Sequence, residues 1–106
     1  MSWGELTGTA FVLTVRPGMC AEYRRRHAEV WPEMERALLA SGIVVYEIFL
    51  DEASGRVFGH MLRDRSEPAE EDPVILRWRA YMADVLEMEG DRPLRTPIEK
   101  VYRLTA

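Results

Sequence analysis

The sequence predicts an α+β protein with one domain, whose elements follow in the order β-α-β-β-α-β. Two observations support this prediction. Four runs of apolar, β-branched and aromatic residues are interspersed with two longer segments that have helical periodicity. The chain has 106 residues, and a chain of this length is expected to fold as one domain. We expect residues 1–8 to form a flexible leader and residues 9–106 to form the domain.

The first strand and the first helix are predicted over residues 8–16 and 19–40. The strand is rich in β-branched and aromatic residues and ends at a Pro-Gly pair. The helix carries apolar residues at steps of three and four, which places them on one stripe, and Gly42 is a typical residue beyond a helix C-terminus. Pro32 lies inside this helix, where it removes a backbone donor and clashes with the preceding turn. We therefore expect a kink or a break near residues 30–31.

Two further apolar runs, residues 43–50 and residues 56–62, are joined by a turn over residues 51–55. Their spacing predicts two antiparallel strands that form a β-hairpin. The next segment, residues 63–72, is polar and acidic and contains a proline. It therefore predicts a loop.

The second helix is predicted from Pro73 to about Met88, because proline suits the first turn of a helix and apolar side chains recur at helical spacing. Residues 89–97 contain glycine and proline and predict a loop, and residues 98–104 alternate well enough for a last strand. This order of elements is that of the ferredoxin-like fold, in which one face of a four-stranded antiparallel sheet packs on both helices. The other face would leave an apolar patch on a monomer. We therefore expect two copies to pair face to face as a homodimeric α/β barrel.

The composition argues against several classes of function. Lysine and arginine number 14 against 18 aspartates and glutamates, for a net charge of −4, whereas nucleic-acid binding needs clustered positive charge. No apolar run is long enough to cross a membrane, and the N-terminus lacks the basic start and apolar stretch of a secretory signal. Cys20 is the single cysteine, so neither an intrachain disulfide nor a thiolate metal site is predicted. We expect a cytoplasmic protein that binds no nucleic acid and enters no membrane.

His27 is the strongest candidate for a catalytic group. It is the side chain on the aromatic stripe of the first helix whose charge changes near neutral pH, so it can serve as a general acid or base. Tyr23 lies one turn before it on the same stripe. The alternative is a histidine on the helix surface, or partly buried, that has no chemical role.

Three other side chains can be assigned either to the core or to a site. Tyr46 lies in the middle of the second strand, where its hydroxyl is either satisfied locally or points into a pocket. Trp78 lies on the second helix, and tryptophan rings pack in cores but also against the C–H faces of sugars. His60 alternates with Phe58 and Leu62, so it shares their face of the third strand, and a structural role is its default interpretation.

Residues 23–33 read Tyr-Arg-Arg-Arg-His-Ala-Glu-Val-Trp-Pro-Glu, which resembles the Y-x-x-R-H-x-x-x-W-P-E signature of the L-rhamnose mutarotase family. Residues 43–51 resemble that family's second strand, with its tyrosine in place. Residues 77–82 match part of its R-W-W-x-Y-M motif, and residues 99–104 resemble its E-V-F-x-L ending. The resemblance covers nearly the whole chain, about residues 10–104.

The resemblance implies a small cytoplasmic homodimer that interconverts the α and β anomers of L-rhamnose, or of a related 6-deoxy aldose, without a cofactor. It implies that His27 is the catalytic proton donor and that Tyr23, Tyr46 and Trp78 contact the monosaccharide. Arg79 stands where the family motif has its second tryptophan, which alters the aromatic wall of the sugar site. We expect Arg79 to bind a more polar or anionic substrate through hydrogen bonds, the alternative being that it faces solvent.

Two other classes of function stay open at this point. One is a different enzyme on the same dimeric barrel, such as a cofactor-free monooxygenase or a cyclase. The other is a non-catalytic module that binds a small molecule. Acceleration of anomer exchange for any aldose would distinguish the mutarotase from both.

Overall fold

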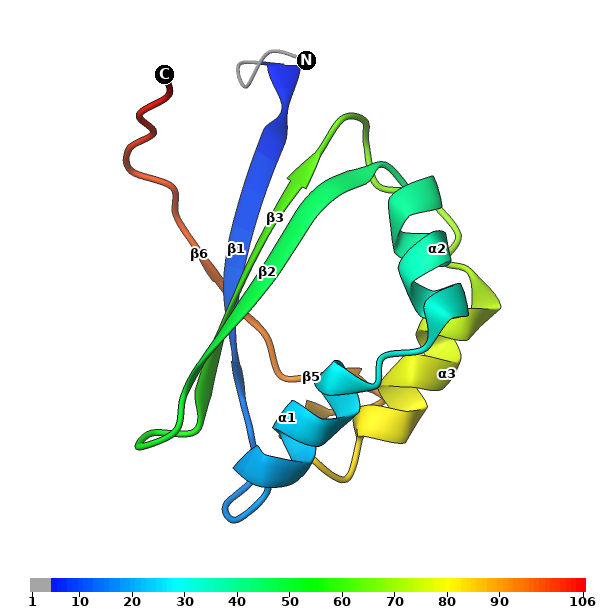
Figure 1. Cartoon of the computed structure of the whole chain (residues 1–106), viewed down its shortest axis with the longest axis vertical. Helices are drawn as coiled ribbons and strands as arrows, with labels where there is room; N and C mark the ends of the chain where they lie inside the picture. The colour runs from blue at the N-terminus through cyan, green and yellow to red at the C-terminus, as the bar shows by residue number, and fades with distance from the viewer. Residues whose placement is uncertain (1–4) are drawn as a thin grey trace.

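The computed structural model describes residues 5–106, and residues 1–4 of the expected leader lie outside the described part. The first strand begins at Thr7, so the last two residues of the expected leader belong to the sheet. The sheet forms one layer, and the helices form a second layer that faces it (Figure 1). The elements in chain order are β1 (Thr7–Thr14), α1 (Cys20–Ala28), α2 (Pro32–Ala40), β2 (Ile43–Asp51), β3 (Arg56–Arg63), α3 (Pro73–Met82), β4 (Met88–Glu89), β5 (Arg92–Pro93) and β6 (Thr96–Ile98).

The main sheet has four antiparallel strands in the order β2-β3-β1-β6. β1 and β3 are neighbours in the sheet although two helices and a strand separate them in the sequence. The last strand, β6, pairs with β1 on the side opposite β3. This is the strand order of the ferredoxin-like fold, so the structure confirms the predicted fold class.

The inner face of the sheet looks toward the helices. Phe11 lies opposite Gly59 in the β1–β3 register, and Tyr46 lies opposite Met61 in the β2–β3 register. A glycine is required beside the phenylalanine, because a Cβ at Gly59 would clash with the Phe11 ring. The register thus fixes which side chains of the sheet can face a site between the two layers.

The outer face of the sheet points away from the helices and carries exposed apolar side chains. Phe58 lies opposite both Val12 and Phe49, and Phe49 is 60% exposed. Ile98 of β6 extends this patch beside β1. His60 lies opposite Ala10 and Glu47 in register with this face, which confirms that it shares the face of Phe58.

The expected break before Pro32 is confirmed. α1 ends at Ala28 and α2 begins at Pro32, with Trp31 in an extended conformation at φ −65° and ψ 130° between them. The ring of a proline disfavours helical geometry in the residue before it, while proline itself is well suited to the first position of a helix. The segment 19–40 is therefore two helices, and the turn between them positions Trp31.

The second predicted helix is shorter than expected, because α3 ends at Met82 and not near Met88. The residues after it leave the helix to bond with the end of β1. The Arg16 amide donates to the Val85 carbonyl, and the Glu87 amide donates to the Thr14 carbonyl, both within 2.9 Å. The apolar pattern that predicted a longer helix comes instead from Val85 and Leu86, which turn into the core.

The last strand is also shorter than predicted. β6 covers Thr96–Ile98, whereas residues 99–106 have no regular structure. Its alternating apolar residues, which suggested a strand over 98–104, stay largely exposed in this chain, with Val101 at 85% and Leu104 at 80%. The preceding segment, expected to be a loop, includes the small antiparallel pair of β4 and β5.

The core lies where β1, β3, α1 and the residues after α3 meet. Its buried members are Val15, Tyr23, Val57, Met82, Val85 and Leu86. Away from this cluster, α2 and α3 lie over the inner face of the sheet (Figure 1). A cavity lies between the two layers there. Within residues 5–106, no helix has the length and apolar character needed to span a membrane.

Candidate active site

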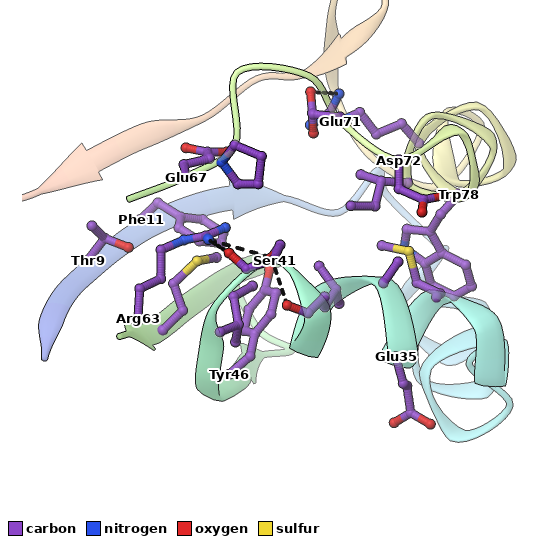
Figure 2. Close-up of a pocket in the computed structure, with 18 of the residues that line it drawn as sticks. Thr9, Phe11, Glu35, Ser41, Tyr46, Arg63, Glu67, Glu71, Asp72 and Trp78 are labelled. Atoms are coloured by element: carbon purple, nitrogen blue, oxygen red, sulfur yellow. Dashed lines mark hydrogen bonds and ion pairs between the residues drawn. The ribbon is translucent and has the colours of Figure 1, made fainter. Parts of the chain in front are cut away.

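A cavity of about 1120 Å³ lies between the inner face of the sheet and the helices. Its size is that of a site for a small molecule. All five side chains that were predicted to form a site line it, which are Tyr23, His27, Tyr46, Trp78 and Arg79. Figure 2 shows how side chains from the sheet, from α2 and from the loop before α3 converge on this space.

His27 lies in the last turn of α1 and is half-buried. Its Nδ1 lies 3.1 Å from the backbone carbonyl oxygen of Tyr23. A carbonyl oxygen only accepts hydrogen bonds, so Nδ1 carries the proton and Nε2 keeps its lone pair. Burial lowers the pKa of His27 from its usual 6.5, which favours the neutral imidazole at pH 7.

Aromatic rings hold the imidazole from two sides. The Tyr23 ring lies 4.3 Å from the His27 ring, and the Trp78 ring meets His27 edge-on at 5.6 Å between centroids. Trp78 is itself held by Trp31, whose ring lies 5.1 Å away in an edge-on contact. Trp31 in turn stacks on Tyr81 at 5.3 Å. These rings come from α1, from α3 and from the turn between α1 and α2, and they surround the imidazole of His27.

Tyr46 reaches the cavity from the sheet. Its ring meets Phe11 edge-on at 6.3 Å, and Arg95 lies with its guanidinium carbon 4.0 Å from the centre of the Phe11 ring. Burial raises the pKa of Tyr46, and the positive charge of Arg95 lowers it by less. Burial also raises the pKa of Tyr23. Both phenols are therefore neutral at pH 7 and available as hydrogen-bond donors.

Arg79 lines the cavity and is only 22% exposed, so the alternative that it faces solvent is wrong. Its Nη1 donates to Oε1 of Glu71 at 2.8 Å, and its Nη2 donates to Oε2 of the same carboxylate. This hydrogen bonding holds the pKa of the Glu71 carboxyl below its usual range. An ion pair, and not an aromatic ring, thus forms this part of the wall.

The sequence did not point to Glu71, Arg95 or Phe11 as parts of the site. Glu71 and Arg95 lie in segments without helical or strand periodicity, and nothing in the sequence relates Glu71 to Arg79 eight residues later. Phe11 was assigned to a strand, and the register that turns it to the inner face follows only from the pairing with β3. His60 lies on the opposite face of the sheet and is not among the residues that line the cavity.

Among residues 5–106, no cluster of three or more histidine, cysteine, aspartate or glutamate side chains has the arrangement needed to hold a metal ion. The side chains that bring chemistry to the cavity wall are of three kinds. These are an imidazole with a lowered pKa, two neutral phenols and an aromatic surface.

A small α+β domain with an aromatic cavity and a single imidazole in its wall is typical of proteins that bind a small polar molecule and move its protons. Comparison with known proteins gives this class a family. The family model described as L-rhamnose mutarotase matches residues 9–104. The chain therefore belongs to the L-rhamnose mutarotase family and is a sugar mutarotase, an isomerase.

Individual relatives agree with the family match. The chain is 39% identical over 100 residues to an L-rhamnose mutarotase of Sinorhizobium fredii, covering 91% of this chain and 96% of the relative. It is 42% identical over 99 residues to an L-rhamnose mutarotase of Jannaschia sp., covering 90% of this chain and 95% of the relative. The crystal structure of an L-rhamnose mutarotase from Formosa agariphila is similar with a TM-score of 0.85 and 27% identity, covering 93% of this chain and 99% of that one.

Proposed function

We propose that this protein interconverts the α and β anomers of L-rhamnose, with His27 as the group that moves the proton at the anomeric centre. The observation that carries the proposal is the imidazole of His27 in the cavity wall. Its Nδ1 is engaged by the Tyr23 carbonyl, and its ring is packed against Trp78. A fixed tautomer and a fixed ring are what a proton-transfer group needs.

The reaction begins at the hydroxyl on the anomeric carbon, C1. The lone pair of Nε2 accepts the hydroxyl proton, the C1–O5 bond breaks, and an aldehyde forms while the ring oxygen O5 takes a proton. Rotation about the C1–C2 bond turns the other face of the aldehyde toward O5. The same steps in reverse close the ring as the other anomer, and His27 returns its proton to the new hydroxyl. His27 is thus an acceptor in opening and a donor in closure.

The second proton, the one that O5 gains on opening, needs a partner on the other side of the sugar. Tyr46, Tyr23 and a water molecule are the candidates. Burial keeps both phenols neutral, so each can donate a hydrogen bond to O5. Tyr46 approaches from the sheet while His27 belongs to α1, so a sugar between the two layers can meet both.

Both aromatic and polar side chains of the cavity wall can bind the sugar. Trp78 offers an aromatic surface suited to the C–H groups of a pyranose ring. Tyr23 and Tyr46 offer hydrogen-bonding groups for its hydroxyls, and Arg79 adds a polar group to the cavity wall. No step of this mechanism draws on a metal ion or a nucleotide.

We further infer that the protein works as a homodimer in which two sheets meet through their outer faces. Phe49 at 60% exposed, Phe58 and Ile98 form an apolar surface on a chain of 12.3 kDa, and such surfaces are rarely left open in monomers. A second copy would cover it and produce the α/β barrel expected from the sequence. The cytoplasmic location expected from the single cysteine stays a prediction.

The experiment that tests the proposed activity is exchange NMR on L-rhamnose. Magnetisation transfer between the α and β anomeric protons measures the interconversion rate at equilibrium, with and without protein. We expect catalysed exchange that scales with protein concentration. A protein that binds L-rhamnose without accelerating exchange would instead support the binding module, and the absence of both binding and exchange would reopen the monooxygenase and cyclase alternatives.

A further inference from the structure

The Glu71–Arg79 pair joins three segments around the cavity. Glu71 belongs to the loop before α3, and Arg79 belongs to α3. Arg92 of β5 also approaches the pair, with its Nη2 3.6 Å from Oε1 of Glu71. The side chains of Glu71 and Arg79 are 21% and 22% exposed, and all three residues line the cavity. Figure 2 shows Glu71 at the side of the cavity away from Tyr46.

The pair leaves hydrogen-bonding capacity for a ligand. A guanidinium carries five N–H groups, and the bonds of Arg79 to Glu71 use one on each terminal nitrogen. Within the described residues the remaining N–H groups of Arg79 have no protein partner. Arg79 lines the cavity, so a ligand that supplies an acceptor there can bond to these N–H groups.

The charge of the cavity wall indicates that this ligand group is neutral. Among the described residues that line the cavity, five arginines face six carboxylates, and the carboxylate of Glu71 lies directly against Arg79. The wall thus has no excess of positive charge to attract a carboxylated or phosphorylated sugar. A hydroxyl, in contrast, can both accept from the guanidinium and donate to the carboxylate.

The substituents on the ring of L-rhamnose are hydroxyls except for the methyl group at C6, which cannot form hydrogen bonds with Glu71 and Arg79. A methyl gains nothing from a charged pair, and it is better placed against an apolar surface. L-mannose has the same stereochemistry as L-rhamnose and differs from it by a hydroxyl at C6. On the basis of the proposed mutarotase activity, we propose that Glu71 and Arg79 form a specificity determinant that admits neutral aldoses carrying a hydroxyl where L-rhamnose has its C6 methyl.

The test compares two sugars in one assay. The kcat/KM for anomer exchange is measured by NMR with L-mannose and with L-rhamnose for the wild type, for Glu71→Gln and for Arg79→Leu. We expect the wild type to use L-mannose within about tenfold of L-rhamnose, and each variant to lower the L-mannose to L-rhamnose ratio by about tenfold or more. Glu71→Gln keeps the shape of the side chain and removes its charge, and Arg79→Leu makes the wall apolar.

Arg77→Ala is the matched control, because Arg77 is exposed on the same helix and does not line the cavity; its ratio should equal that of the wild type. Unchanged ratios in both pocket variants would overturn the proposal, even if both rates fall, since the pair would then contact a group that the two sugars share. If the variants do not fold, the wild type is the test, and an L-mannose to L-rhamnose ratio of kcat/KM below about 0.1 would overturn the proposal. A wild type that exchanges neither sugar overturns the proposed function itself.

Discussion

The guanidinium carbon of Arg26 lies 4.3 Å from the centre of the Tyr81 ring, and its nitrogen atoms hold the end of α3. Nη1 donates to the Tyr81 carbonyl at 2.6 Å and to Asp84 at 2.8 Å. Arg26 is buried, 8% exposed, although its neighbours Arg24 and Arg25 in the sequence are exposed. This contact fixes α1, which carries His27, against the helix that carries Trp78.

We predict that Arg26→Met destabilises the protein and that Arg25→Met does not. The first change leaves the Tyr81 carbonyl without its donor and should lower the free energy of unfolding by about 1–3 kcal/mol. Arg25 makes its ion pairs with Glu22 and Glu29 at the exposed surface, where such pairs contribute little. Urea unfolding followed by circular dichroism measures both. Equal midpoints for the two variants would show that Arg26 does not hold the helices together.

The second prediction concerns Tyr46. Burial raises its pKa, so its phenol is a good hydrogen-bond donor but a reluctant source of a free proton. We expect Tyr46→Phe to lower kcat/KM for L-rhamnose exchange by about tenfold, the effect of one lost hydrogen bond of about 1.4 kcal/mol. Tyr102→Phe, in the exposed C-terminal segment, is the control and should retain the wild-type rate. A loss as large as that of a His27 variant would identify Tyr46 as the second proton carrier.

The break at Pro32 and the shared stripe of Tyr23 and His27 could be predicted from the sequence, because both are local effects. Backbone geometry decides the first within two residues, and helical periodicity decides the second within one turn. The Glu71–Arg79 pair could not be predicted, because it depends on how a loop without periodicity folds back on α3. The early end of α3 could not be predicted either, because it depends on a contact distant in the sequence: the Val85 carbonyl accepts from the amide of Arg16, just after β1.

The outer sheet face gives the third prediction. We expect sedimentation at micromolar concentration to show a species of about twice 12.3 kDa. Phe58→Glu should convert it to a monomer, because Phe58 lies opposite Val12 and Phe49 in the centre of the apolar patch and a buried unpaired carboxylate is costly. Leu76→Glu places the same charge on an exposed position of α3 and should leave the dimer intact. A monomeric wild type would refute the barrel.

The last prediction is that exchange depends on the neutral form of His27. Burial lowers its folded pKa from 6.5, and Nε2 must be unprotonated to accept the proton of the anomeric hydroxyl. The kcat/KM should therefore be constant around pH 7 and should fall as the pH drops through the lowered pKa of His27. Stability changes in the same direction, because below pH 6.5 the unfolded chain binds a proton that the buried imidazole resists.

His27→Asn tests this dependence directly. Asparagine keeps a polar side chain of similar size and retains hydrogen-bonding groups, but it does not titrate. We expect exchange of L-rhamnose to slow by about 10²-fold or more, as for the loss of one general acid–base group, and the acidic limb of the pH profile to disappear. His60→Asn changes the histidine on the outer sheet face and should keep both the rate and the limb. A folded His27→Asn protein that exchanges L-rhamnose at the wild-type rate would remove His27 from the mechanism. No other histidine among the described residues lines the cavity, so none could take over its role there.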